Sequence, residues 1–172
     1  MKTLKAKALT PEGFARYGAY QNLLDTDDLA KKSIMPPFGF FPDVMTLEFG
    51  GSPTVSVCSV KKGDKNIVAF MEAHAHTCEG LLPIDGDVII YVGAAFGAAF
   101  GAPEHWSTDQ LEAFIVPKGT FVKLNSLVIH GSQYAIDADE VHLLCMLPAR
   151  TFNNDMLSSM VMDDDKKVEL TI

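Results

Sequence analysis

The segment FMEAHAHTCEG places Glu72, His74, His76 and Glu79 within eight residues of otherwise apolar and small side chains. Imidazole nitrogens and carboxylate oxygens are common ligands of first-row divalent metal ions. If the segment is a strand, its period of two puts both histidines on one face, where they can bind one ion as adjacent ligands. Glu79, three residues further on, can add a carboxylate oxygen. The segment therefore predicts a metal site.

A fourth ligand has to come from elsewhere in the chain, and His130 is the best candidate. It ends an alternating run of residues that share one face of a second predicted strand: Val122, Leu124, Ser126, Val128 and His130. Three imidazole nitrogens and one carboxylate oxygen suit a divalent ion such as Mn, Fe, Ni or Zn, with positions left open for a chelating substrate. The spacing does not choose among these ions.

Two further side chains of this segment have alternative interpretations. Glu72 lies on the histidine face, where an unpaired buried carboxylate is costly. It is therefore either hydrogen-bonded to a ligand histidine or a catalytic general base with a raised pKa. Cys78 could bind a soft metal as a thiolate, although a small buried side chain is the simpler interpretation. The competing hypothesis for the whole cluster is that its histidines are core or surface residues with ordinary hydrogen bonds.

Short apolar or alternating runs recur along the chain at strand spacing, and they have to position these side chains. Turn-forming sequences such as FGGSP, KKGDK, PIDG and PKG separate the runs. We expect strands over residues 44–49, 54–60, 66–76, 87–92, 113–116, 121–130, 133–136 and 141–147. About eight short strands with little helix between them predict an all-β sandwich or closed barrel, and not a parallel doubly wound sheet.

The remaining segments are expected to be helical or irregular. LTPEGFARYGAY predicts a short N-terminal helix with Thr10 as N-cap, ending near Gly18, and residues 107–113 also look helical. Proline and glycine in MPPFGFFPDV, residues 35–44, predict a loop with aromatic anchors. The C-terminal end predicts a short strand. The segment GAAFGAAFGAPEH, residues 93–105, is either a flexible connection or a lid made by two phenylalanines, Phe96 and Phe100.

Length and composition predict one soluble domain spanning residues 1–172. The hydrophobic fraction of 48% and charged fraction of 21% are typical of globular proteins, and no apolar run reaches the length of a membrane span. The net charge of −8 disfavours nucleic acid as a partner. We see no secretory signal, and three widely spaced cysteines do not suggest disulfides, so we expect a cytoplasmic location.

The predicted strand 66–76 also bears on partners. Its second face is wholly apolar: Ile67, Ala69, Met71, Ala73 and Ala75. Another sheet layer, the N-terminal segment or a second subunit must cover that face, and we expect a homodimer. The chain has only two arginines, Arg16 and Arg150, so a metal ion or lysines would help to hold the carboxylate of a small-molecule substrate.

Two longer segments resemble the motifs of the cupins. HAHTCEGLLPIDG is similar to the first cupin motif, and VPKGTFVKLNSLVIHG is similar to the second. The resemblance implies a cupin-type double-stranded antiparallel β-barrel, or jelly roll, that holds a metal inside. The gap between His76 and Glu79 is shorter than in the usual motif. Val122 stands three residues after Gly119, where the second motif has histidine, so His130 would be a displaced fourth ligand.

Over residues 4–150, the chain resembles the ureidoglycolate lyase family, formerly called ureidoglycolate hydrolase. The resemblance rests on the order of LTPEGFARYGAY, LPIDGDVIIYVGA, STDQLEAFIVPKG and VIHG. It implies a metal-dependent lyase of allantoin degradation, in purine catabolism, that cleaves ureidoglycolate to glyoxylate and urea. Glu72 is then the candidate base, and Lys123, Tyr91 or an arginine could assist. The family's first motif has one histidine, and glutamine at the position of Glu79, so the ligand set here is richer.

Other functions are compatible with the same residues, because a fold does not fix a function. One is a different metal-dependent cupin enzyme, such as an isomerase or dioxygenase that acts on a small hydroxy acid, keto acid or sugar. Another is a non-enzymatic cupin that binds a small ligand in its barrel. Iron dependence with oxygen consumption would favour a dioxygenase, and recovery of an intact ligand without metal would favour a binding module.

Overall fold

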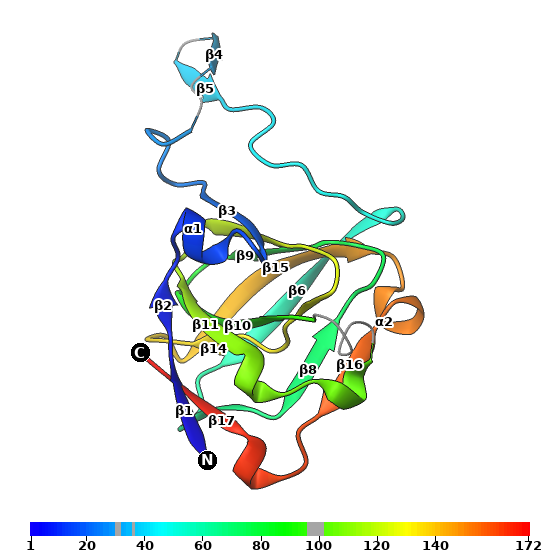
Figure 1. Ribbon diagram of the computed structural model, residues 1–172. Coiled ribbons are helices and arrows are strands. Elements are labelled where there is room, and N and C mark those ends of the chain that lie inside the picture. Colours follow the sequence, from blue (N-terminus) through cyan, green and yellow to red (C-terminus); the bar gives the residue numbers. More distant parts are fainter. Residues whose placement is uncertain (30–31, 36, 96–101) are drawn as a thin grey trace.

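The computed structural model describes residues 1–29, 32–35, 37–95 and 102–172, which form an all-β fold with a few short helices (Figure 1). Two five-stranded sheets dominate this part of the chain. In the first, sheet I, the strand order is β3-β12-β9-β15-β6. In the second, sheet II, the order is β13-β10-β11-β2, and β14 also pairs with β10. The predicted all-β fold class is confirmed.

The elements have the following bounds. Sheet I contains β3 (Gly18–Asn22), β12 (Thr120–Leu124), β9 (Glu79–Pro83), β15 (Glu140–Pro148) and β6 (Pro53–Lys61). Sheet II contains β13 (Val128–Ile129), β10 (Val88–Ala94), β11 (Leu111–Val116), β2 (Lys7–Ala8) and β14 (Tyr134–Ala135). Smaller sheets contain β1 (Lys2–Lys5), β17 (Val168–Thr171), β7 (Asn66–Val68), β16 (Leu157–Met160) and β8 (Phe70–Ala73). The helical turns are α1 (Pro11–Phe14), α2 (Thr151–Asn154), η2 (Pro103–His105), η3 (Thr108–Gln110) and η4 (Asp164–Lys166).

The main hydrophobic core lies between the facing sides of sheets I and II. Its buried side chains alternate along each strand with outward ones, and they include Leu81, Val122, Leu143, Val88, Ile90 and Phe114. Each such side chain contributes about 1.5–3 kcal/mol by leaving water. This core holds in place β9, which begins with Glu79, and β13, which directly precedes His130.

Sheet II is covered on both of its faces. Residues 88–93 of β10 are all buried, which explains the unbroken apolar run in this strand. The second face of sheet II packs against Met71 and against C-terminal residues such as Leu170. The apolar face of the segment around Met71 and Ala73 is therefore covered by the chain itself, and the exposed fractions of these residues are 1% and 0%. The homodimer stays a prediction.

Most predicted strands are present. Those expected over 54–60, 87–92, 113–116, 133–136 and 141–147 are confirmed as β6, β10, β11, β14 and β15, and β17 is the expected C-terminal strand. The strand expected over 44–49 is wrong, because these residues form no strand. Their backbone groups make loop contacts instead: the Glu48 carbonyl accepts a hydrogen bond from the Cys78 N–H at 3.2 Å.

Both predicted strands that carry candidate ligands are interrupted. The segment 66–76 changes partner after Val68, since β7 pairs with β17 whereas β8 pairs with β16, and it leaves the strand conformation after Ala73. The segment 121–130 is divided into β12 and β13 by a turn in which Leu127 has φ 61°. The direction in which each candidate ligand points therefore cannot be derived from a single alternation that continues through the whole segment.

The predicted helices are shorter than expected. Thr10 caps the N-terminal helix by accepting a hydrogen bond from the Gly13 N–H, but α1 ends at Phe14 because Gly18 already begins β3. A Cβ atom at Gly18 would lie 1.8 Å from the Lys123 carbonyl oxygen, so the strand pairing requires glycine here. The helix expected over 107–113 is reduced to η3, because the chain pairs with β10 from Leu111 onward.

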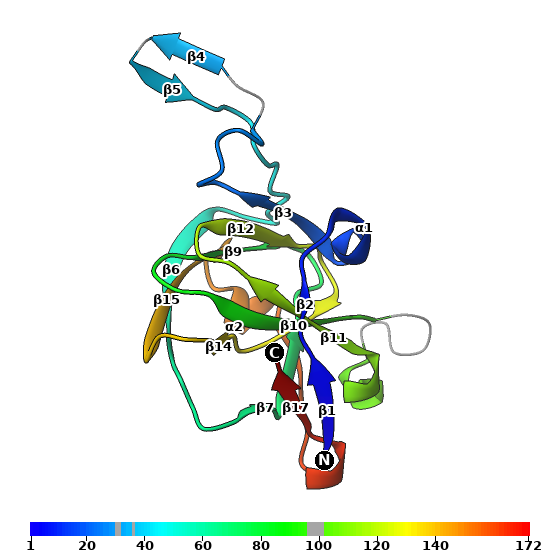
Figure 2. The same ribbon diagram turned by 90° about the vertical axis from the view of Figure 1, so that its left-hand side faces the viewer.

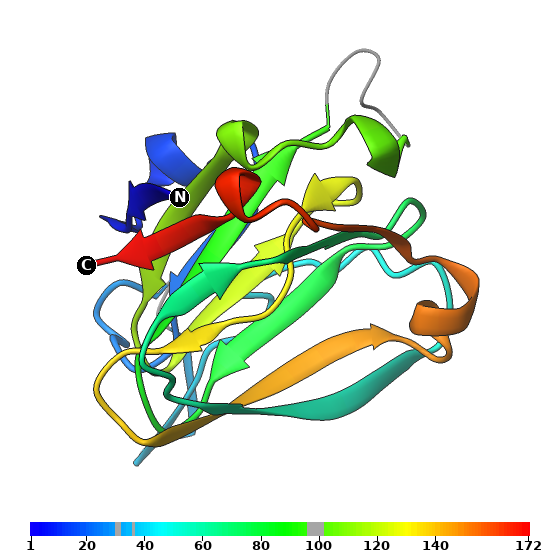
Figure 3. The same ribbon diagram turned by 90° about the horizontal axis from the view of Figure 1, so that it is seen from below.

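Part of the expected loop over 35–44 forms a hairpin. Strands β4 (Lys32–Met35) and β5 (Phe38–Phe40) pair with each other and stand away from the two sheets (Figures 1 and 2). Phe96 and Phe100, the candidate lid, lie outside the described residues. At the other end of the molecule, β1 and β17 pair in parallel, which brings residues 2–5 beside 168–171 (Figure 3). No described helix has both the length and the hydropathy needed to cross a membrane.

Candidate metal centre

Backbone pairing brings His130 next to the segment that carries His74. Glu72 and His130 form an antiparallel bridge in which both N–H to carbonyl distances are 2.8 Å. Further along the same two segments, the Leu127 N–H donates a hydrogen bond to the His74 carbonyl at 2.7 Å. The two segments therefore run antiparallel, and the rings of His74 and His130 lie with their centroids 5.2 Å apart.

Glu79 completes a cluster with these two histidines in the interior. Its Oε2 atom lies 2.7 Å from His130 Nε2 and 3.3 Å from His74 Nε2. One possible ligand atom from each residue lies within 4.8 Å of the other two, and all three residues are buried. Metal–ligand bonds of about 2.0–2.2 Å place neighbouring ligand atoms roughly 3 Å apart. The spacing in the cluster thus suits a shared ion.

Hydrogen bonds on the far side of each ring determine which nitrogen faces the cluster. His74 Nδ1 lies 2.8 Å from the Asp155 carbonyl, and His130 Nδ1 lies 2.8 Å from the Val128 carbonyl. A carbonyl only accepts hydrogen bonds, so each Nδ1 carries a proton and each Nε2 is left to bind.

Both Nε2 atoms are buried, and neither makes a hydrogen bond of acceptable geometry despite its proximity to Glu79. Buried polar atoms without such partners are rare in folded proteins. A cation shared with Glu79 would satisfy both nitrogens, so these residues fit a metal ion.

The charges in the cluster reinforce one another. Burial would raise the pKa of Glu79, but the facing His130 and His74 hold it well below its usual range. Burial would likewise lower the pKa of His130, but the Glu79 carboxylate, helped by Glu72, raises it to about 9. The site therefore favours positive charge next to the Glu79 carboxylate, and either a proton or a divalent cation can supply it.

Glu72 stands beside the cluster without joining it. Its Oε1 atom is 4.0 Å from His130 Nε2, which is too far for a hydrogen bond. Burial raises the pKa of Glu72 above its ordinary value, although the nearby His130 opposes that shift. The distance therefore does not support the interpretation in which Glu72 orients a ligand histidine through a hydrogen bond.

The structure places His76 apart from the other three predicted ligands. Its side chain is 84% exposed, and its Nδ1 atom lies 3.0 Å from Asp155 Oδ1. The reason is that the strand ends at Ala73, so the alternation that would have aligned His76 with His74 does not continue. The Asp155 carboxylate holds the turn that follows, accepting the N–H groups of Ala75 and His76 at 2.9 Å each.

Solved structures provide a comparison for this architecture. The chain is similar to a dTDP sugar isomerase from Desulfovibrio desulfuricans G20, with 11% identity, a TM-score of 0.50 and coverage of 80% of this chain and 85% of that one. The fold is a cupin fold. Oxalate decarboxylase from Bacillus subtilis matches with 14% identity and a TM-score of 0.42 over 64% of this chain, which spans 24% of the length of that enzyme. No family model and no curated protein sequence matches the chain.

Within this cupin fold, the other candidate side chains are engaged elsewhere. Lys123 binds Glu48 at 3.0 Å on the outer face of sheet I, as its phase along the strand indicates. The Tyr91 hydroxyl donates to the Phe70 carbonyl at 2.5 Å. Arg16 pairs with Glu112, next to the N-terminal helix. These contacts place the charged groups of Lys123 and Arg16 in ion pairs outside the cluster and the Tyr91 hydroxyl on a backbone carbonyl.

Two residues near the cluster were not singled out from the sequence. The Cys145 thiol donates to Glu79 Oε1 at 3.3 Å, from the inward side of β15. Residues 143–147 are apolar on both faces of the strand, so the sequence alone does not indicate which face Cys145 takes. Asp155 follows α2, and no local pattern connects it with His74 and His76. Its role arises only from tertiary structure.

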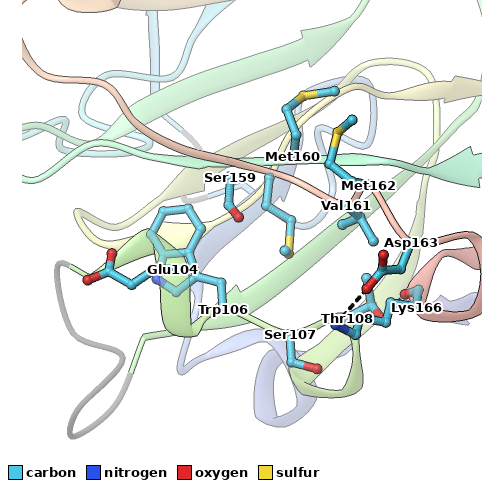
Figure 4. A pocket seen from close by; sticks show the side chains of 11 residues that line it. Glu104, Trp106, Ser107, Thr108, Ser159, Met160, Val161, Met162, Asp163 and Lys166 are labelled. Atoms are coloured by element: carbon cyan, nitrogen blue, oxygen red, sulfur yellow. Dashed lines mark hydrogen bonds and ion pairs between the residues drawn. The ribbon is translucent and has the colours of Figure 1, made fainter.

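A separate cavity lies on the opposite side of β8 from the cluster of His74, Glu79 and His130. Met71, the neighbour of Glu72, lines this cavity of about 360 Å³, and alternation along the strand directs the two side chains to opposite faces. Figure 4 shows Trp106 on one side of it and the Asp163–Lys166 ion pair on the other. The candidate metal centre and this cavity are therefore distinct features of the structure.

Proposed function

We propose that this chain is a metal-dependent enzyme in which His74, Glu79 and His130 hold a divalent first-row ion. The observation that carries the proposal is the convergence of two buried Nε2 atoms without good hydrogen bonds on one carboxylate oxygen. Three protein ligands leave positions open for a substrate, whereas structural zinc sites are closed by four. Glu72, beside the cluster, is the proposed catalytic base.

The proposed substrate is a small α-hydroxy carboxylate, and ureidoglycolate is the compound that the resemblance of the chain implies. A bound ion would supply Lewis acidity to the hydroxyl and carboxylate oxygens that chelate it. Glu72 would accept the hydroxyl proton and return it to the departing urea nitrogen as the carbon–nitrogen bond breaks. Glyoxylate and urea are the products, and Glu72 regains its starting protonation state. The raised pKa of Glu72 supports both proton transfers.

The ligand set supports a second candidate function. Without His76, the cluster offers two histidines and one carboxylate, which is the set typical of non-haem iron(II) oxygenases. Such an enzyme would bind a small hydroxy or keto acid together with dioxygen at the open positions. An isomerase could use the same ligands without consuming oxygen.

One experiment separates these candidates. Purified protein is stripped of metal, reloaded in parallel with manganese, iron, nickel or zinc, and incubated with racemic ureidoglycolate while urea and dissolved oxygen are measured. Metal-dependent urea release without oxygen uptake supports the lyase. Oxygen uptake with iron alone supports the oxygenase. Metal binding without either signal contradicts both reactions but leaves the metal site standing, and failure to bind any of the ions contradicts the proposal as a whole.

A further inference from the structure

Two cysteine side chains lie next to each other between the two main sheets, and the proposed mechanism uses neither. Cys58 lies on β6 and Cys145 on β15, and the antiparallel register pairs Cys58 with Leu143 and Cys145 with Ser56. The two cysteines are therefore diagonal neighbours whose side chains point to the same face of sheet I. Both pack in the core between sheets I and II, so this is the inner face.

The two thiols are free, and they interact with each other. A hydrogen bond from the Cys145 thiol lowers the pKa of the Cys58 thiol to about 7, although burial opposes that shift. A substantial fraction of Cys58 is then a thiolate near neutral pH, and the thiolate is the form that attacks an oxidant. Cys58 is also partly exposed, whereas Cys145 is only 3% exposed. A small oxidant can therefore reach Cys58 first.

The position of β6 at the edge of sheet I lets the two sulfur atoms approach bonding distance. Diagonal neighbours on adjacent strands have Cα atoms about 7–8 Å apart and a disulfide needs about 4.4–6.8 Å, so the strands must approach by roughly 1 Å. Among the described residues, β6 pairs only with β15, so no strand is hydrogen-bonded to its other edge. This edge strand can therefore follow Cys58 toward Cys145.

The Cys145 thiol also contacts the candidate metal centre. Its single proton has a second acceptor, Glu79 Oε1, which lies 3.3 Å from the sulfur. The other oxygen of that carboxylate, Oε2, faces the Nε2 atoms of His74 and His130. A reaction that removes the Cys145 proton thus removes a hydrogen-bond donor from a proposed ligand. Loss of such an outer contact typically weakens metal binding about 10- to 100-fold.

We propose that Cys58 and Cys145 form a redox site, at which a peroxide converts the two thiols into a disulfide. The Cys58 sulfur first attacks the peroxide, so that a sulfur–oxygen bond forms, the oxygen–oxygen bond breaks and hydroxide leaves with the proton of Cys58 as water. The Cys145 sulfur then attacks the Cys58 sulfenic acid, so that the disulfide forms and a second water leaves with the proton of Cys145. The two thiols are oxidised, and the peroxide is reduced. A dithiol reductant reverses the reaction.

The third cysteine provides a matched control. Cys78 is as buried as Cys145, at 3% exposure, but it lines a different cavity together with Lys123, whose ammonium lies on the outer face of sheet I. Burial raises the pKa of the Cys78 thiol, which makes it a poor nucleophile. Cys78 should therefore take no part in the reaction.

The test measures the intact mass of the wild type, Cys58→Ala, Cys145→Ala and Cys78→Ala after treatment with hydrogen peroxide. We expect the wild type and Cys78→Ala to lose the mass of two hydrogen atoms per chain and to regain it with dithiothreitol. Peptide mapping without reductant should locate the link between Cys58 and Cys145. Cys145→Ala, shown to be folded by circular dichroism, should instead stop at a sulfenic acid on Cys58 that dimedone traps. A wild type that keeps both thiols, or a link that involves Cys78 or a second chain, overturns the proposal.

A second measurement follows the consequence for the metal, which rests on the proposed function. Manganese, which prefers oxygen and nitrogen ligands to thiolates, is titrated into oxidised and into re-reduced wild type after the peroxide has been removed. We expect affinity to be lower by about tenfold or more in the oxidised protein, and the same treatment to leave Cys58→Ala unchanged. Equal affinities would contradict an effect of the disulfide on the metal centre. If the reduced protein binds no metal, the proposed function fails, whereas the redox site stands or falls with the mass measurement.

Discussion

His74 and His76 are two residues apart, yet they occupy opposite environments. His74 is 2% exposed and directs Nε2 toward Glu79, whereas the side chain of His76 is 84% exposed and faces solvent. Asp155 contacts both: its carbonyl accepts from His74, and its carboxylate lies against His76. The comparison shows that a His-x-His spacing does not by itself direct two side chains into one site. The end of the strand and the contact behind each ring decide which histidine faces inward.

The largest expected loss of metal affinity comes from Glu79→Gln. The substitution keeps the shape of the side chain but removes the negative charge that both Nε2 atoms face. Since loss of an outer contact already weakens metal binding about 10- to 100-fold, loss of this ligand should weaken it by more than about 100-fold. Isothermal titration with the ion that the wild type binds best checks the prediction. Unchanged affinity would show that Glu79 is not a ligand.

Glu72→Gln separates chemistry from metal binding. Because Glu72 lies beside the cluster and is not part of it, the variant should retain its metal. If Glu72 transfers protons, the turnover number falls by about 100-fold or more. The measurement is urea release by metal-loaded protein, with metal content determined on the same sample. Full activity in the variant would remove Glu72 from the proposed mechanism.

Asp155→Ala tests the residue that contacts the rings of both His74 and His76. The variant leaves two backbone N–H groups without their acceptor in the turn between His74 and Glu79, so that turn should loosen. Metal affinity is then expected to fall by about tenfold or more, in the range typical of residues that orient ligands. His76→Ala is the matched control, since it removes another contact of the same carboxylate. Equal effects of the two substitutions would contradict the assignment of Asp155 as a positioning residue.

A smaller effect, on the pKa of one side chain and on the stability of the fold, is expected at His142, which is another exposed histidine beside an aspartate. Its Nδ1 atom lies 2.7 Å from Asp85 Oδ2, and this hydrogen bond and charge raise the pKa of His142. The pair therefore stabilises the fold below the ordinary histidine pKa of about 6.5, and this stabilisation is lost as pH rises through the folded-state pKa. NMR titration should give a lower pKa for His142 in Asp85→Asn than in the wild type. No decrease would show that the pair does not form in solution.

Much of the fold follows from local sequence patterns. The apolar run over residues 141–147 predicted a strand that is present, and Thr10 marked the start of the N-terminal helix. The failures lie where tertiary contacts override local pattern. Residues 44–49 have the composition of a strand but form none, and the segment 66–76 changes partner after Val68. Neither outcome can be read from the residues concerned.

The candidate site could likewise be predicted in part, because local sequence patterns select residues but do not fix tertiary contacts. His74, Glu79 and His130 were selected by residue type and spacing, and the structure brings these three together. His76 was selected on the assumption of a strand that ends too early to align it with His74. Asp155 was missed because its contacts depend on how α2 packs. The residue types of the candidate site could thus be selected from the sequence, whereas the orientation of each side chain depends on distant segments.

The most direct test of the proposed metal site is the metal content of purified wild type, His130→Ala and His76→Ala, loaded with the same ion and desalted together. His130 is distant in sequence but adjacent to His74 in the structure, whereas His76 is the sequence neighbour that points outward. We expect about one ion per chain in the wild type and in His76→Ala, and little or none in His130→Ala. Loss of metal from His76→Ala with retention in His130→Ala would contradict the proposed site.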